Sequence, residues 1–198
     1  MPDVVPSHPW VQRIHQVLVA SPGREVATDG SPARAAVALV FREAGEDVEL
    51  LLIRRAERSG DPWSGQIALP GGRFDPTDAS LFDTAVRETW EETAVDLQSL
   101  GVPLGVLDEL HPRTPVLPPI IIRPYVFALT ADPTIEPSHE VAEAFWVGLS
   151  TLRDPAVSRE SVVHPRGDPW RVPSFVVREH IVWGLTERIL RGLLARLD

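Results

Sequence analysis

Three glutamates, Glu88, Glu91 and Glu92, lie within little more than one turn of a segment that we expect to be helical. Residues three and four positions apart share a helix face, so the three carboxylates would cluster and repel one another. A cation would relieve this repulsion, and hard divalent ions such as Mg²⁺ take oxygen ligands from carboxylates and from substrate phosphates. Taken alone, the same pattern is also typical of a solvated acidic helix face.

A glycine pair before this helix favours the metal interpretation. Gly71 and Gly72 precede residues 78–94, the clearest helical pattern in the chain. Glycines leave backbone N–H groups accessible at close range, as a phosphate site requires. We expect the residues that recur at spacings of three and four to form the buried stripe of the helix, with the glutamates largely on the opposite face. That stripe comprises Phe82, Ala85, Val86, Thr89 and Trp90.

The elements around this helix mix strands and helices. Apolar periodicity predicts helices over residues 8–20 and 176–197, and short apolar runs predict strands over residues 35–41, 48–53, 67–69, 101–107, 119–129 and 144–147. The first two strands would form a hairpin that turns near Gly45, and segments 21–33, 58–66 and 70–72 would be connectors or breaks. A mixed sheet covered by helices is the simplest architecture for this order.

Composition excludes several classes of protein. The chain has 198 residues and no cysteine, which excludes a disulfide scaffold, a zinc ribbon and thiol catalysis. Its net charge of -9 argues against a nucleic-acid partner, since such binding depends on neutralising phosphates. No apolar run reaches the roughly 18 residues of a membrane helix. The N-terminal residues also lack the pattern of a secretory signal, so we expect a cytoplasmic protein.

The glycine pair and the acidic helix together resemble the Nudix box. Its Arg-Glu-x-x-Glu-Glu core is present in full in residues 87–95 (RETWEETAV). Asp78 stands where the box has its first Glu, Ala94 stands where it has its closing Gly, and the spacing from Gly72 to the Arg is one residue longer. The resemblance implies a single-domain Nudix α/β/α sandwich with a mixed β-sheet. It would occupy residues 31–198, including the C-terminal helix, after an N-terminal helical extension and linker at residues 1–30.

The resemblance also implies hydrolysis of a diphosphate linkage by a metal-activated water, with Mg²⁺ or Mn²⁺ as cofactor. The acids of the box would hold the metal, Arg87 would orient one of them, and a glutamate before the strand at 144–147 would supply a further ligand or the general base. The expected metal ligands are Glu88, Glu91 and Glu92; the expected catalytic residues are Arg87, Glu91, Glu92, Glu140 and Glu143; the expected substrate-binding residues are Arg54, Arg55, Gly71, Gly72 and Arg73.

An upstream segment is similar to the signature of Nudix coenzyme A pyrophosphatases. It reads Leu51-Leu52-Ile53-Arg54-Arg55-Ala56 and later Leu69-Pro70-Gly71-Gly72, while Asp61 stands where that signature has its second Arg. The similarity implies cleavage of coenzyme A or acyl-CoA into adenosine 3′,5′-bisphosphate and 4′-phosphopantetheine. Two alternatives stay open: hydrolysis of another nucleoside diphosphate derivative, such as ADP-ribose or a dinucleotide, and a non-catalytic nucleotide-binding regulator. The expected partner is a small nucleotide substrate, and a homodimer is left open.

Overall fold

A mixed sheet forms the centre of the computed structural model, which describes residues 1–2, 4–28, 30–58, 63–112 and 119–198. Within these residues the sheet has seven strands: β1 (Ala33–Ala44), β2 (Asp47–Arg55), β3 (Ile67–Ala68), β4 (Gly71–Arg73), β5 (Gly101–Val106), β6 (Ile120–Leu129) and β7 (Val141–Gly148). The order along the sheet is β3-β2-β1-β6-β5, with β4 also pairing with β1 and β7 with β2. β1 and β6 run parallel, and the other pairs are antiparallel.

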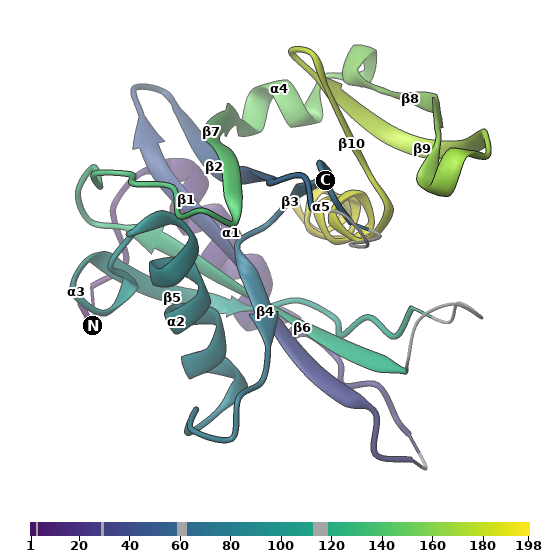
Figure 1. Cartoon of the computed structure of the whole chain (residues 1–198). Helices are drawn as coiled ribbons and strands as arrows, with labels where there is room; N and C mark the ends of the chain where they lie inside the picture. Colours follow the sequence, from purple (N-terminus) through teal and green to yellow (C-terminus); the bar gives the residue numbers. More distant parts are fainter. Residues whose placement is uncertain (3, 29, 59–62, 113–118) are drawn as a thin grey trace.

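Helices cover both faces of this sheet (Figure 1). On one face lie α1 (Pro9–Ala20) and α5 (Gly184–Leu197), and on the other lies α2 (Leu81–Thr93). The smaller elements are α3 (Leu97–Leu100), α4 (Leu149–Arg153), the 3₁₀ turns η1 (Pro155–Val157) and η2 (Pro165–Gly167), and a second sheet of β8 (Ser158–Val163), β9 (Trp170–Val177) and β10 (His180–Trp183). The predicted α/β/α sandwich with a mixed sheet is therefore confirmed.

Alternation along the strands divides the core into two layers. In β1, Leu39 and Phe41 pack toward α1 and α5, whereas Ala38 and Val40 pack toward α2. The α2 side carries small residues, so the helix can approach the sheet closely. None of the helices in the described ranges is long and apolar enough to cross a membrane.

Most predicted elements are present at nearly the predicted positions. The hairpin of β1 and β2 turns at Gly45 and Glu46, where Gly45 has a φ of +65° that suits glycine. The N-terminal helix is confirmed as α1, and its Val11, Ile14 and Leu18 join the same core cluster as α5. Part of the predicted connector 58–66 lies outside the described residues.

The predicted terminal helix over residues 176–197 is wrong in its first part. Residues up to Trp183 belong to β9 and β10, and the helix begins only at Gly184, whose φ is +71°. Val177 pairs with His180 across a two-residue turn that contains Arg178 with φ +55°. The β-branched pairs Val176-Val177 and Ile181-Val182 favour strands, and their apolar spacing resembles that of a helix over this short stretch. The strands β8 and β9 were not predicted.

The predicted break at residues 70–72 is also wrong in part, because Gly71 and Gly72 lie in β4. They pair with Val37 and Ala36 of β1. Glycine lowers the expectation of a strand, but here it permits the close approach of two backbones.

The orientation of α2 differs from the prediction. The helix begins at Leu81 with Ser80 as its N-cap, so Asp78 lies in the preceding loop. Trp90 is 55% exposed, whereas Glu92 is only 4% exposed and lies on the buried side with Ala85 and Thr89. The two predicted assignments, Trp90 buried and Glu92 on the opposite face, are therefore wrong. Small side chains at the contact allow α2 to pack tightly against the sheet, and the wide Trp90 is excluded from it.

Ala94→Gly is expected to raise the free energy of unfolding by about 1 kcal/mol. Ala94 ends α2 in the left-handed conformation with φ 57°, and its N–H donates to the carbonyl of Trp90. An L-residue is strained there, whereas glycine is not. Urea denaturation should show the increase. The control Ala142→Gly, at an exposed β7 position without positive φ, should lower stability. A decrease in both variants would contradict the assignment of strain to residue 94.

Candidate active site

The glycine pair of β4 lies directly between β1 and α2. Gly71 has a φ of +153°, and a Cβ on it would come within 2.3 Å of the Ala36 carbonyl oxygen. A Cβ on Gly72 would lie 2.3 Å from Oε1 of Glu88. Gly71 is therefore required by its backbone conformation and by the Ala36 carbonyl, whereas a side chain at position 72 would displace the Glu88 carboxylate.

Glu92 is the buried acid of this site. Its Oε2 accepts a hydrogen bond of 2.9 Å from the backbone N–H of Gly71. The pKa of Glu92 is raised to about 7, mainly by burial and also by the negative charge of Glu88, while the Gly71 hydrogen bond and the charge of Arg55 act in the opposite direction. Burial also raises the pKa of Glu88. The chain thus places two carboxylates where their negative charge is unfavourable without a cation.

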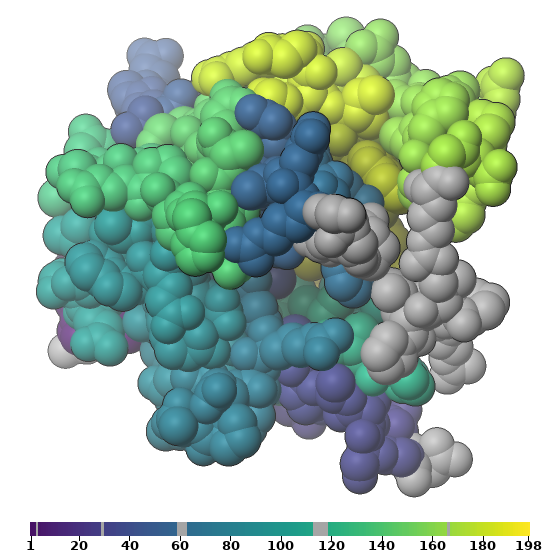
Figure 2. All heavy atoms as spheres, in the orientation of Figure 1, coloured from purple at the N-terminus to yellow at the C-terminus, as the bar shows by residue number. Residues whose placement is uncertain are grey.

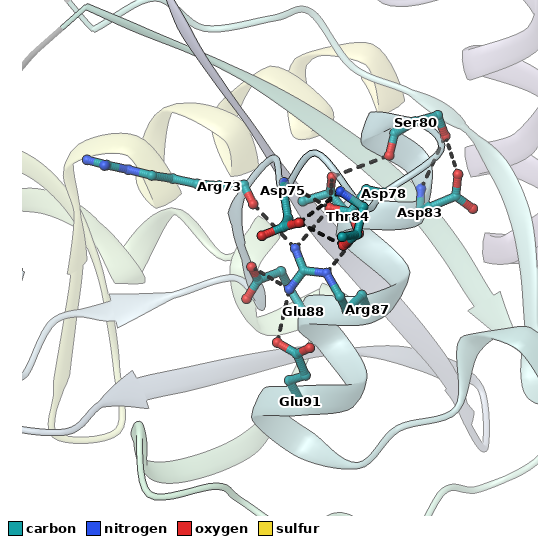
Figure 3. Close-up of polar contacts among 10 residues, drawn as sticks. Arg73, Asp75, Asp78, Ser80, Asp83, Thr84, Arg87, Glu88 and Glu91 are labelled. Atoms are coloured by element: carbon teal, nitrogen blue, oxygen red, sulfur yellow. Dashed lines mark hydrogen bonds and ion pairs between the residues drawn. The ribbon is translucent and has the colours of Figure 1, made fainter.

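Arg87 connects the other acids of the site (Figure 3). Its Nε and Nη2 bind the two oxygens of Asp78 at 2.8 and 2.9 Å. Its Nη1 donates to Glu88 at 2.9 Å and to Glu91 at 3.0 Å. The Arg87 guanidinium holds the pKa of Asp78 well below its usual range. Arg87 therefore fixes the orientation of the Glu88 carboxylate, whose Oε1 also lies against Gly72.

The pairing of Asp78 with Arg87 was not predicted from the sequence, although both residues were noted in the motif. Asp78 also accepts a 2.8 Å hydrogen bond from the Thr84 hydroxyl in the first turn of α2. The available signal was a loop acid nine positions before an arginine, next to a serine that caps the helix. Aspartate is shorter than the glutamate that the motif has at this position, but it is long enough here because both of its oxygens accept hydrogen bonds directly from Arg87.

Glu140 precedes β7 and Glu143 lies within it, and the fold separates the two side chains. The charge of Glu140 contributes to the raised pKa of both Glu88 and Glu92. Glu143 instead lies 3.4 Å from Arg54 and 3.5 Å from His180, whose ring stacks on Phe145 in the core layer of α1 and α5. The structure brings Glu140, but not Glu143, to the acids of α2.

The three predicted substrate-binding arginines also separate. Arg54 pairs with Glu143 on the side away from α2, whereas the charge of Arg55 acts on Glu92. Arg73 contributes its carbonyl to Arg87 at 3.3 Å, and its side chain extends away from the acid cluster (Figure 3). Asp61 lies outside the described residues.

The donor set of the site fits a hard divalent cation that also takes ligands from substrate. No three His, Asp or Glu side chains in the described ranges are arranged to hold a metal by themselves. Glu88 and Glu92 nevertheless offer adjacent carboxylates with raised pKa values, and Glu91 is held by Arg87. Mg²⁺ commonly uses one or two protein carboxylates together with phosphate oxygens and water, so this pair suffices.

Comparisons with known proteins identify the family to which this chain is related. A family model described as the NUDIX domain matches residues 31–166. The Nudix hydrolase NudL of Photorhabdus laumondii subsp. laumondii is 34% identical over 150 residues, which cover 75% of this chain and 77% of that protein. NudL of Cronobacter sakazakii is 33% identical over 149 residues, covering 75% of this chain and 74% of that protein.

Solved structures support the same fold. The MutT protein of Methanosarcina mazei Go1 superposes with a TM-score of 0.50 at 29% identity, covering 64% of this chain and 83% of that one. A MutT/nudix family protein from Enterococcus faecalis gives a TM-score of 0.55 at 18% identity and covers 94% of this chain and 68% of that one. The second likeness concerns the fold alone.

Proposed function

The chain belongs to the Nudix family of hydrolases, and from that premise we propose that it hydrolyses the diphosphate linkage of coenzyme A or an acyl derivative. The products would be adenosine 3′,5′-bisphosphate and 4′-phosphopantetheine or its acylated form. The observation that carries the proposal is the buried carboxylate of Glu92 beside the partly buried carboxylate of Glu88, both packed against Gly71 and Gly72. A purely structural acidic helix face would leave these side chains in solvent.

Each residue of the site has a proposed task. Glu88 and Glu92, with Glu91 beside them, would hold Mg²⁺ or Mn²⁺, which when bound neutralises phosphate charge and lowers the pKa of water. Arg87, anchored by Asp78, keeps Glu88 and Glu91 oriented. Backbone at the glycine pair and the guanidinium of Arg55 would contact phosphate oxygens.

Glu140 is the proposed general base, and two observations support this choice: its charge acts on Glu88 and Glu92, and Glu143 instead pairs with Arg54 and His180. It would accept the proton of the attacking water, and its position in a loop rather than in the helix leaves it accessible. Its side chain is 42% exposed, so it can reach a substrate that enters from solvent.

The choice of substrate rests on the residues upstream of the glycine pair. Leu51 to Ala56 and Leu69 to Gly72 resemble the coenzyme A signature, and coenzyme A carries a 3′-phosphate in addition to the diphosphate. Arg73 is the proposed contact for that phosphate, since its side chain is exposed and extends away from the acids (Figure 3). Figure 2 shows a hollow in this face of the molecule, next to the blue segment that follows β2.

Coenzyme A is expected to be cleaved with a kcat/KM about tenfold higher than 3′-dephospho-coenzyme A or ADP-ribose, which corresponds to one charge-assisted contact of about 1.4 kcal/mol. Release of adenosine 3′,5′-bisphosphate from coenzyme A, and of AMP from the other two substrates, with Mg²⁺ or Mn²⁺ measures this. Arg73→Ala should remove the preference. The control Arg54→Ala changes an arginine that is already paired with Glu143 and should retain the preference.

Three outcomes separate the proposal from its alternatives. A preference for ADP-ribose or for the dephospho form would assign the enzyme to another nucleoside diphosphate substrate. Binding of nucleotide without hydrolysis of any of the three would indicate a regulator. Equal turnover of coenzyme A and its dephospho form would contradict the proposed contact between Arg73 and the 3′-phosphate.

A further inference from the structure

Arg58 joins the loop after β2 to the loop before β7. Its Nη1 lies 3.1 Å from Oε1 of Glu140, and each side chain is 42% exposed. The N–H of Arg58 donates to the Ser64 hydroxyl at 2.8 Å, and the N–H of Ala56 donates to the Glu140 carbonyl at 2.8 Å. Hydrogen bonds therefore hold the backbone near both ends of the ion pair, while its charged groups remain open to solvent.

The same ion pair borders the acid cluster of the site. The N–H of Ser138 donates to the carbonyl of Glu92 at 3.0 Å, which attaches the Glu140 loop to the end of α2. The negative charge of Glu140 acts on both Glu88 and Glu92. Arg58 is thus a cation positioned where a diphosphate would approach a strongly acidic surface.

A diphosphate is a better partner for Arg58 than Glu140 is. An ion pair between half-exposed side chains contributes at most about 1 kcal/mol, because water solvates both charges. Phosphate oxygens carry more charge and match the planar guanidinium with two parallel hydrogen bonds. Transfer of Arg58 from carboxylate to phosphate is therefore favourable, and it leaves Glu140 without its cation.

We infer that Arg58 changes partner when substrate binds, pairing with Glu140 in the free enzyme and with a substrate phosphate in the complex. This inference rests on the proposed hydrolysis of a diphosphate. Arg58 would then be both a substrate-binding residue and the residue that releases Glu140 to act as base only when a diphosphate is present. His139 contributes little to this pair, since its Nε2 lies 3.9 Å from the Glu140 oxygen on an exposed side chain.

A double-mutant cycle on binding tests the exchange. The probe is α,β-methylene-ADP, a diphosphate that cannot be hydrolysed at this linkage, titrated calorimetrically with Mg²⁺ into the full chain. Arg58→Ala should weaken binding about tenfold, and Arg58→Lys should recover most of the affinity because the charge is retained. Glu140→Gln should tighten binding roughly two- to fivefold, since a competing partner is removed. In the Arg58→Ala background the same Glu140→Gln change should have less than half of this effect.

The outcomes distinguish the exchange from simpler roles. Independent effects of the two substitutions would overturn the exchange, because a general repulsion by Glu140 predicts no coupling. Weaker binding by Glu140→Gln would overturn it as well, because a purely structural ion pair predicts a loss of affinity on removal of either partner. Wild-type protein that does not bind the analogue at all would overturn the proposed function and the exchange with it. Arg153→Ala is the matched control, since Arg153 forms a 3.0 Å ion pair with Asp198 at another surface, and its affinity should equal that of the wild type.

Discussion

Glu92→Gln should lower kcat by about 10²–10³-fold while the protein stays folded. The amide keeps an acceptor for the Gly71 N–H, so the packing of the folded protein is retained. It removes the negative charge that a divalent cation requires, so the metal site is lost. Steady-state turnover at saturating Mn²⁺, with circular dichroism to confirm the fold, measures this. Wild-type turnover in the variant would exclude Glu92 as a metal ligand.

The same substitution should raise the stability of the metal-free protein at high pH. The folded-state pKa of Glu92 is about 7, above the ordinary value of 4.5. The protonated form is therefore favoured by folding, and its contribution is fully present below pH 4.5 and is lost as the pH rises through 7. We expect the wild type to lose about 2–3 kcal/mol between pH 5 and pH 8 for this reason, and the Gln variant to lose less.

Denaturation in EDTA at both pH values checks the stability effect. Glu91→Gln is the control, because its carboxylate is 53% exposed and its removal should leave the pH dependence close to that of the wild type. Identical pH dependence in wild type and Glu92→Gln would show that burial of Glu92 has no energetic cost.

The second large effect is expected for Gly72→Ala, with a loss of about 100-fold in kcat. The added methyl would lie 2.3 Å from Oε1 and 2.4 Å from Cδ of Glu88, so this carboxylate must move by an ångström or more. Gly72 has no positive φ, which means that the substitution displaces the acid without straining the backbone. The measurement is turnover at several Mg²⁺ concentrations together with the melting temperature.

Shortening Glu88 to aspartate should compensate for the methyl group that Gly72→Ala adds. Glu88→Asp combined with Gly72→Ala should be more active than Gly72→Ala alone, because the shorter side chain leaves room for the methyl. Gly192→Ala is the matched control: a Cβ there meets nothing within 4 Å, so turnover should not change. Lower activity in the double variant than in either single variant would contradict a steric origin.

The sequence by itself determined the layers of the fold and the identity of the acidic helix. Alternating and helical apolar patterns are local properties, so the β1–β2 hairpin, β6 and α1 could be predicted from residue spacing. The association of Gly71 and Gly72 with Glu88 could also be anticipated, since a motif with fixed spacing specifies its own local geometry.

Only the tertiary structure decided which side chains meet. Periodicity gave α2 an apolar stripe but not its rotation against the sheet, and close packing on Ala36 and Ala38 turned Glu92 inward and Trp90 outward. Strand alternation by itself predicts opposite faces for Arg54 and Arg55, but the groups that each of them meets, Glu143 for Arg54 and Glu92 for Arg55, are set by the tertiary structure. Glu143 pairs with Arg54 in the register of β7 on β2, whereas Glu140 lies in the loop before β7. Contacts between distant segments depend on register and packing, which no short stretch of sequence contains.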